Sequence, residues 1–94
     1  MNTYMIRRRR AWNSTAELSK AAERSKAVAE SEFPDSIRWI RSYVLTEENG
    51  TLGTVCIYQA RDIQAVRRHA ERVGMPADEV VPVADTVVVR PDPV

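Results

Sequence analysis

One histidine and one cysteine are the residues of this sequence best suited to chemistry. His69 is the only histidine, and because an imidazole titrates near neutral pH it could serve as a metal ligand or a general base. The common alternative is a histidine at the edge of a helix that packs its ring and hydrogen-bonds the last turn. Cys56 is the only cysteine, which excludes an intrachain disulfide and a multi-cysteine metal site. No cationic neighbour of Cys56 is evident, so we expect it to be a small buried hydrophobe.

Four consecutive arginines, residues 7–10, form the densest charge in the sequence. Side chains alternate across a strand, which would send Arg7 and Arg9 to one side and Arg8 and Arg10 to the other. We expect Arg9 and Arg10 to reach water. An arginine partway along a strand with buried neighbours must form an ion pair with an acidic residue or face an anionic ligand. Whether Arg7 or Arg8 occupies this position stays open. Arg8 is included among the candidate ligand-binding residues.

Aromatic side chains supply the other candidates, because their rings give contact area and their polar tips orient ligands. A core or a dimer interface is the more common setting for such rings. With His69 and Arg8, the candidate ligand-binding residues are Tyr4, Trp39, Tyr43 and Tyr58.

Several classes of function are disfavoured by motif content and charge. The sequence contains no glycine-rich phosphate loop, no His-Glu-x-x-His and no Gly-x-Ser-x-Gly, and adjacent Asp78 and Glu79 lie in an expected turn, where a solvated cap is usual. Fourteen basic and thirteen acidic residues leave a net charge of +1, too balanced for a dedicated nucleic-acid binder. No apolar run approaches the roughly 18 residues of a membrane span. With a single cysteine, these features predict a cytoplasmic protein that binds neither nucleic acid nor membrane.

The hydrophobic periodicity predicts the element order β-α-β-β-α-β within one domain, residues 1–94, with a tail at 90–94. A first strand spans residues 3–9, and a helix follows a cap at Ser14 or Thr15 and ends near Glu32. A hairpin occupies residues 37–60. The second helix, capped by Asp62 and ended by Gly74, precedes a last strand at residues 80–90 that is broken near residues 84–85. This order is that of a ferredoxin-like α+β domain, a four-stranded antiparallel sheet with two helices on one face.

The hairpin carries the preferred pair for a two-residue type I′ turn, Asn49-Gly50. In that register Val44 faces Val55, and Tyr43 faces Cys56. A bulge at Gly53 would exchange the faces of the third strand.

Both faces of the predicted sheet are apolar, although the helices cover only one of them. An uncovered sheet face of this kind would be a larger exposed apolar patch than soluble monomers usually carry. We therefore expect a homodimer in which two sheets pack face to face.

The stretch VRRHAERVGMPADEVVPV, residues 66–83, resembles a signature of a small bacterial family catalogued as domain of unknown function 4242. Some of its members are described as nickel-binding proteins. The matching features are an arginine-rich helix with His69 near its end, then Gly74, then Pro76-Ala77-Asp78-Glu79. The stretches IRWIRSYV and VCIYQARD resemble the family's second and third strands, and the resemblance runs from Tyr4 to Val88.

This resemblance implies a ferredoxin-like fold of the dimeric α+β barrel type, and nickel or another divalent transition metal held by His69. A site shared across a dimer could add Glu71 or Asp78. The leading hypothesis is a small dimeric binding protein that holds a metal ion or a small ligand between helices and sheet. The alternative is a cofactor-independent monooxygenase, cyclase or isomerase with His69 as its base, so whether the protein is an enzyme stays open. An RNA-binding sheet is disfavoured by the missing third-strand signature.

Overall fold

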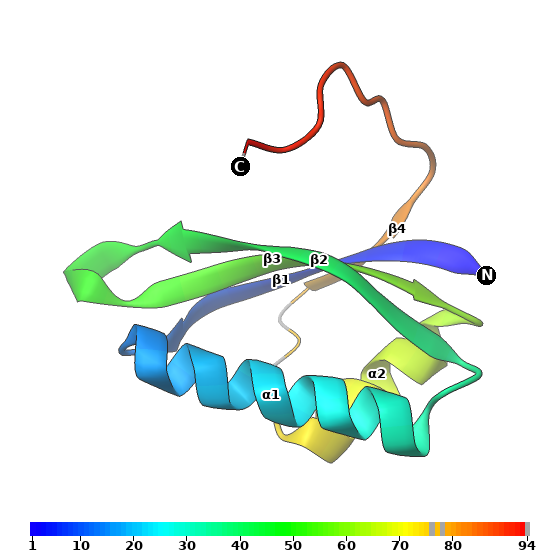
Figure 1. The fold of residues 1–94 in the computed structure, drawn as a ribbon, viewed down its shortest axis with the longest axis horizontal. Helices are drawn as coiled ribbons and strands as arrows, with labels where there is room; N and C mark the ends of the chain where they lie inside the picture. Colours follow the sequence, from blue (N-terminus) through cyan, green and yellow to red (C-terminus); the bar gives the residue numbers. More distant parts are fainter. Residues whose placement is uncertain (76, 78, 94) are drawn as a thin grey trace.

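The fold is a four-stranded antiparallel sheet with two helices on one face (Figure 1). It comes from a computed structural model that describes residues 1–75, 77 and 79–93. The elements in chain order are β1 (Asn2–Trp12), α1 (Thr15–Glu32), β2 (Ile37–Thr46), β3 (Leu52–Ala60), α2 (Ile63–Val73) and β4 (Glu79–Val83). The sheet order is β2-β3-β1-β4. The predicted ferredoxin-like class is confirmed, whereas the predictions for Pro76 and Asp78 lie outside the described residues.

The helices start at the predicted caps. The Ser14 hydroxyl accepts a hydrogen bond from the backbone N–H of Glu17 at 3.2 Å, so Ser14 rather than Thr15 caps α1. Asp62 accepts from the backbone N–H of Ala65 at 2.9 Å at the start of α2. Gly74 ends α2 in the left-handed conformation, with φ at 76°. No helix in the described part of the chain is both long and apolar enough to cross a membrane.

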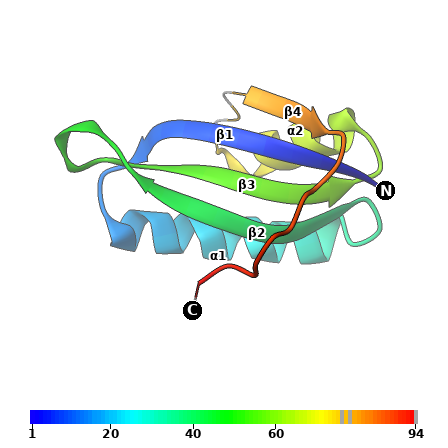
Figure 2. The same ribbon diagram turned by 90° about the horizontal axis from the view of Figure 1, so that it is seen from above.

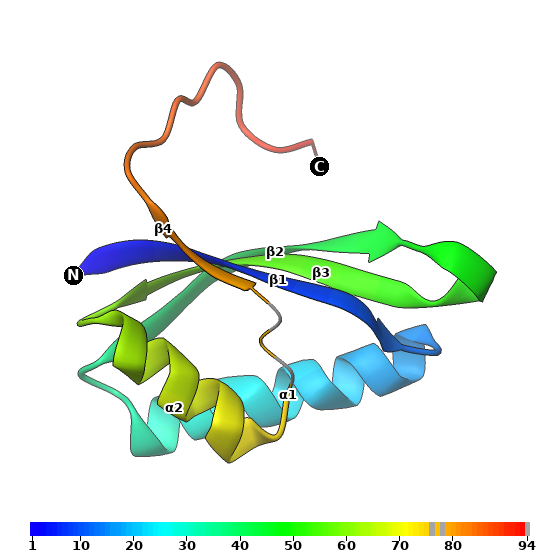
Figure 3. The ribbon, with the colours of Figure 1, turned by 180° about the vertical axis from the view of Figure 1, so that it is seen from behind.

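The two helices cover different parts of the same sheet face, as Figures 2 and 3 show. The α1 helix lies along the β2 side, and α2 lies towards β1 and β4. At about 1.5 Å per residue, the 18 residues of α1 span about 27 Å and the 11 residues of α2 only about 16 Å. One end of the face beneath α1 is therefore left without a second helix.

The core lies between this sheet face and the helices. Alternation along β1 places Tyr4, Ile6 and Arg8 on one face, as predicted, and in the structure this face points inward. The buried apolar residues that pack there are Tyr4, Ile6, Ala29, Ile37, Cys56, Tyr58, Ala60, Ala65 and Val66.

The predicted hairpin register is wrong by one residue. Asn49 and Gly50 both have positive φ, and the Thr51 N–H donates to the Glu48 carbonyl at 3.1 Å, so the expected turn is present. The Glu47 N–H, however, also donates to the Thr51 carbonyl, at 2.9 Å. Two residues of the β2 side thus face Thr51, and this extra residue shifts the pairing.

The shift exchanges the faces of β2. Val44 pairs with Thr54, and Tyr43 with Val55, instead of Val55 and Cys56. A second irregularity, between Trp39 and Arg41, shifts the register by one more residue, so that Trp39 pairs with Tyr58. Ser42 and Trp39 therefore share the helix-covered face with Cys56 and Tyr58, while Tyr43 lies on the open face.

The last strand is shorter than predicted. Pairing of β4 with β1 stops at Thr3 and Val83, and residues 84–93 continue without strand structure over the open face (Figure 1). Asp92 accepts from the Tyr43 hydroxyl at 3.0 Å and from Arg41 at 3.3 Å, which ties this segment to β2. The tail therefore begins at residue 84 rather than 90.

Candidate functional site

The four arginines divide between two environments. Arg9 and Arg10 keep 53% and 63% of their side chains exposed, which confirms their predicted solvation. Arg7 lies on the open side, where it forms an ion pair with Glu47. The Arg7 hydrogen bond, followed by the backbone N–H of Arg10, holds the pKa of Glu47 below its ordinary value. Arg8 alone among them is fully buried on the helix-covered face, which answers the question that the sequence left open.

Arg8 meets a line of polar groups on β2 and β3. Its guanidinium donates to the Cys56 sulfur at 3.5 Å, and the Ser42 hydroxyl donates to the same sulfur at 3.0 Å. The Trp39 indole N–H donates to Ser42 at 2.8 Å. Cys56 is buried, as predicted, but the expectation that it lacks a cationic neighbour is wrong. The cause is the pairing of β1 with β3, which places Arg8 beside a strand nearly fifty residues away.

His69 belongs to an aromatic cluster beside these groups. Its ring centroid lies 5.9 Å from that of Tyr58 and 5.8 Å from that of Phe33, and Tyr58 stacks on Trp39 at 6.1 Å. The side chain is 1% exposed, and Nε2 lies 3.0 Å from the Ser25 carbonyl. Since a carbonyl can only accept, Nε2 carries the proton. Nδ1 has no hydrogen-bond partner among the described residues.

Burial governs the protonation of this cluster. Desolvation lowers the pKa of His69 below 6.5, and the positive charge of Arg8 acts in the same direction. Desolvation likewise raises the pKa of the Tyr58 hydroxyl above 10.0, so that the group stays protonated at neutral pH. Its oxygen lies 3.4 Å from the hydroxyl oxygen of Ser25.

A cavity of about 240 Å³ lies between α1 and the sheet. Most of its lining is apolar or aromatic, with several hydroxyl groups and a thiol between. The lining residues are Trp12, Leu18, Ser19, Ala22, Ser25, Trp39, Ser42, Val44, Thr54, Cys56, Tyr58 and Met75. Thr54 is 2% exposed, and its hydroxyl has no hydrogen-bond partner in the described part of the chain. A buried hydroxyl without a hydrogen-bond partner is energetically unfavourable, so a ligand that hydrogen-bonds it would gain binding free energy.

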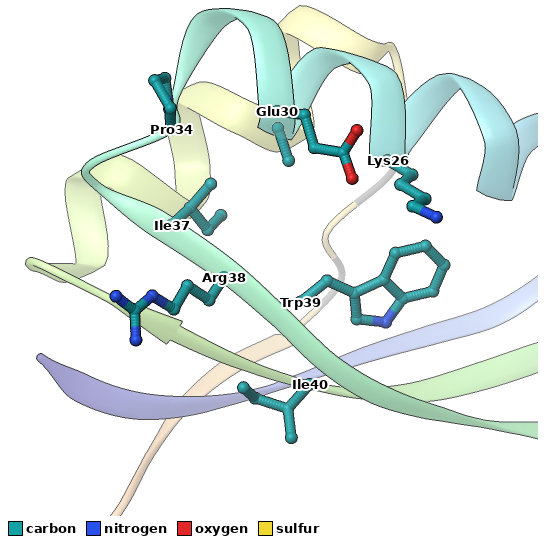
Figure 4. A pocket seen from close by; sticks show the side chains of 8 residues that line it. Lys26, Glu30, Pro34, Ile37, Arg38, Trp39 and Ile40 are labelled. Atoms are coloured by element: carbon teal, nitrogen blue, oxygen red, sulfur yellow. The ribbon is translucent and has the colours of Figure 1, made fainter.

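An outer groove of about 480 Å³ borders this cavity at the sheet edge (Figure 4). Lys26 and Glu30 of α1 line one side of it, and Ile37 and Arg38 of β2 the other. Trp39 lines both the groove and the cavity.

The structure brings together four of the six candidate residues: Arg8, Trp39, Tyr58 and His69. Tyr4 is buried on the same face as a core residue, and Tyr43 lies on the open face. His69 touches Tyr58 but is not among the residues that line the cavity. Sequence reasoning did not include three hydroxyl residues of the site, Ser25, Ser42 and Thr54, because single serines and threonines carry no distinguishing pattern.

The surroundings of His69 do not fit a nickel ion. Nickel takes imidazole and other nitrogen or oxygen donors, several at once. The described residues contain no group of three histidine, cysteine, aspartate or glutamate side chains that could hold a metal. The rings of Phe33 and Tyr58 and the Ser25 carbonyl surround His69 instead.

Comparison with known proteins places the chain in a family. Residues 4–83 match the family described as nickel responsive protein SCO4226-like. The chain belongs to this family. The predicted relation to nickel-binding-type proteins is thereby confirmed at the level of the family.

A solved member shows the same fold as this SCO4226-like chain. It is the crystal structure of SCO4226 from Streptomyces coelicolor A3(2), with a TM-score of 0.72 and 20% sequence identity over 90% of this chain and 99% of that one. Curated proteins gave no match. At such low identity the likeness is evidence for the fold, and the chemistry of the site has to be argued from this chain's own residues.

Proposed function

We propose that this SCO4226-like protein is a small homodimeric binding protein that holds one small, mostly apolar organic molecule between α1 and the sheet. The observation that carries the proposal is the cavity of about 240 Å³, which contains a buried hydroxyl without a partner at Thr54. Cavities of roughly 150 Å³ lined by apolar side chains bind benzene, whereas drug-sized ligands take roughly 300 Å³ or more. The volume therefore suits a molecule with one or two rings.

An organic ligand agrees better with the side chains than a metal ion does. The family description refers to nickel, but a nickel site here would need donors beyond the described residues of a single chain. The enzymatic alternative asks His69 to act as a base. Its Nε2 is already bonded to the Ser25 carbonyl, and the ring does not line the cavity, so the geometry favours binding over catalysis.

The homodimer is proposed from the open face of the sheet. Ile40 and Tyr43 of β2 and Val81 of β4 are 41–45% exposed, although such side chains are normally covered. Residues 87–89, all valine, are 70–87% exposed where the tail passes over this face. A second copy of the chain would cover the same apolar patch on both subunits in a two-fold arrangement.

Ligand binding is tested with toluene as the probe, followed by ¹H–¹⁵N chemical-shift changes of the full chain. The wild-type protein should show saturable shifts confined to residues around the cavity. Ala22→Phe, which fills the cavity from α1, should abolish them. The matched control is Ala27→Phe on the exposed side of the same helix, which should leave binding intact. Equal binding to both variants, or none to the wild type, would refute the proposal.

The oligomeric state is tested by sedimentation equilibrium. Ile57 lies on the open face of β3, so Ile57→Arg should convert a dimer into a monomer. Gln64→Arg, which adds the same charge to the exposed side of α2, should stay dimeric. A wild-type protein that is monomeric at about 100 μM would contradict the dimer.

A further inference from the structure

We infer that the cavity selects a single-ring aromatic molecule that carries one hydroxyl or carbonyl oxygen, with the Thr54 hydroxyl as the group that recognises the oxygen. The inference rests on the proposed binding function and names its ligand class. Three observations carry it: the aromatic walls, the hydrogen-bonding state of the polar groups, and the charge behind one end of the cavity.

The walls of the cavity favour a flat ring. Trp12, Trp39 and Tyr58 contribute aromatic side chains to the lining, and Trp39 and Tyr58 are already stacked, with an angle of 23° between their planes. Aromatic rings pack on one another in offset or edge-to-face arrangements that add to simple area burial. The sulfur atoms of Cys56 and Met75 also line the space, and divalent sulfur makes favourable contacts with ring edges.

Most polar groups of the lining already have hydrogen-bond partners. Ser42 accepts from Trp39 and donates to Cys56, and the hydroxyl oxygens of Ser25 and Tyr58 lie 3.4 Å apart. The Thr54 hydroxyl is buried in the same lining without a partner among the described residues. One hydroxyl can therefore direct one polar substituent, while the rest of the ligand meets apolar surface.

The charge near Thr54 sets the polarity of that substituent. Arg8 pairs with Thr54 across β1 and β3, and its guanidinium lies 3.5 Å from the Cys56 sulfur, which lines the cavity. A buried positive charge favours an electron-rich atom close by, which an oxygen substituent supplies and an ammonium group does not. The ligand class is thus an aromatic ring with an oxygen that accepts from Thr54.

Phenol and toluene test this inference, because they have nearly the same size and differ in the one oxygen. Their affinities are measured by the same chemical-shift titration on wild type, Thr54→Val and Thr54→Ser. The ratio of phenol affinity to toluene affinity should fall about fivefold in Thr54→Val, the value of one neutral hydrogen bond. Thr54→Ser keeps the hydroxyl and should keep the ratio. Comparing this ratio between wild type and variant cancels the difference in hydration free energy between phenol and toluene.

The outcomes separate the inference from the function on which it rests. Toluene binding with an unchanged phenol ratio in Thr54→Val would overturn the role of Thr54 and leave the binding function standing. Absence of toluene binding to the wild type would overturn both. If Thr54→Val does not fold, nuclear Overhauser effects between bound phenol and the wild-type protein provide the test. The Thr54 methyl group should lie against the phenol ring. Phenol bound elsewhere would refute the inference.

Discussion

Removing the buried histidine should change how the stability of the protein depends on pH. His69 is 1% exposed, and its ring contacts those of Phe33 and Tyr58. Burial, and then the charge of Arg8, lower its pKa below 6.5, while the Ser25 carbonyl and Glu32 oppose this more weakly. The unfolded chain therefore binds more protons than the native one once the pH falls below 6.5. Stability should fall as the pH decreases through this range.

The size of the effect has an upper limit. With an unfolded pKa of 6.5, a native state that never bound the proton would lose about 1.4 kcal/mol of unfolding free energy between pH 7.5 and pH 5.5. His69 is the only histidine, so few other side chains titrate in this interval. The slope between pH 6 and 5.5 should be at most about 1.1 kcal/mol per pH unit.

The assay is urea denaturation at pH 7.5, 6.5 and 5.5, at one fixed protein concentration because a dimer would make stability depend on concentration. The comparison variant is His69→Gln, whose amide can still donate to the Ser25 carbonyl but cannot be protonated. Its stability should be nearly flat over the range, so the difference from wild type isolates His69. Parallel curves for the two proteins, or an imidazole that titrates at or above pH 6.5 by NMR, would refute the reasoning.

Three further predictions concern stability. Val66→Ala should cost about 2 kcal/mol in urea denaturation, because the side chain is fully buried, and the exposed Gln64→Ala on the same helix should cost little. Gly53→Ala should lower the unfolding free energy by at least about 2 kcal/mol, since a Cβ there would lie 2.6 Å from the Arg8 carbonyl oxygen. Gly50→Ala should lower it by only about 1 kcal/mol, because the space around Gly50 is open and only its φ of +74° is unfavourable for alanine. A larger loss of thermal stability for Gly50→Ala than for Gly53→Ala would contradict this reasoning. Asp62→Ala should cost about 1 kcal/mol through the lost cap, and an unchanged melting temperature would argue against that role.

Much of the fold could be predicted because its signals are local. The caps at Ser14 and Asp62 and the stop at Gly74 each depend on residues within one turn of helix. Alternation alone places Tyr4, Ile6 and Arg8 on one face of β1. The type I′ turn at Asn49-Gly50 also forms as its residues dictate. The dimer and the ligand, in contrast, remain predictions that the tests above address.

The register of the hairpin goes together with a contact that no local pattern contains. Glu47 occupies the extra position before the turn, and its carboxylate bonds Arg7, forty residues earlier in the chain. That single residue moves Tyr43 to the open face and brings Ser42 to Cys56. The candidate site therefore contains Ser42 in place of Tyr43, because a shift of one residue sends the side chains of a strand to the opposite face.

Spacing along a few residues is enough to give the order of the elements, their caps and the grouping of Tyr4, Ile6 and Arg8 on one side of β1. The packing of strands and helices against one another is what buries Arg8 rather than Arg7, brings hydrogen-bond donors to Cys56, and leaves the Thr54 hydroxyl in the cavity with no partner among the described residues. The physical reason is that burial and hydrogen bonding depend on the side chains that other strands and helices bring into contact.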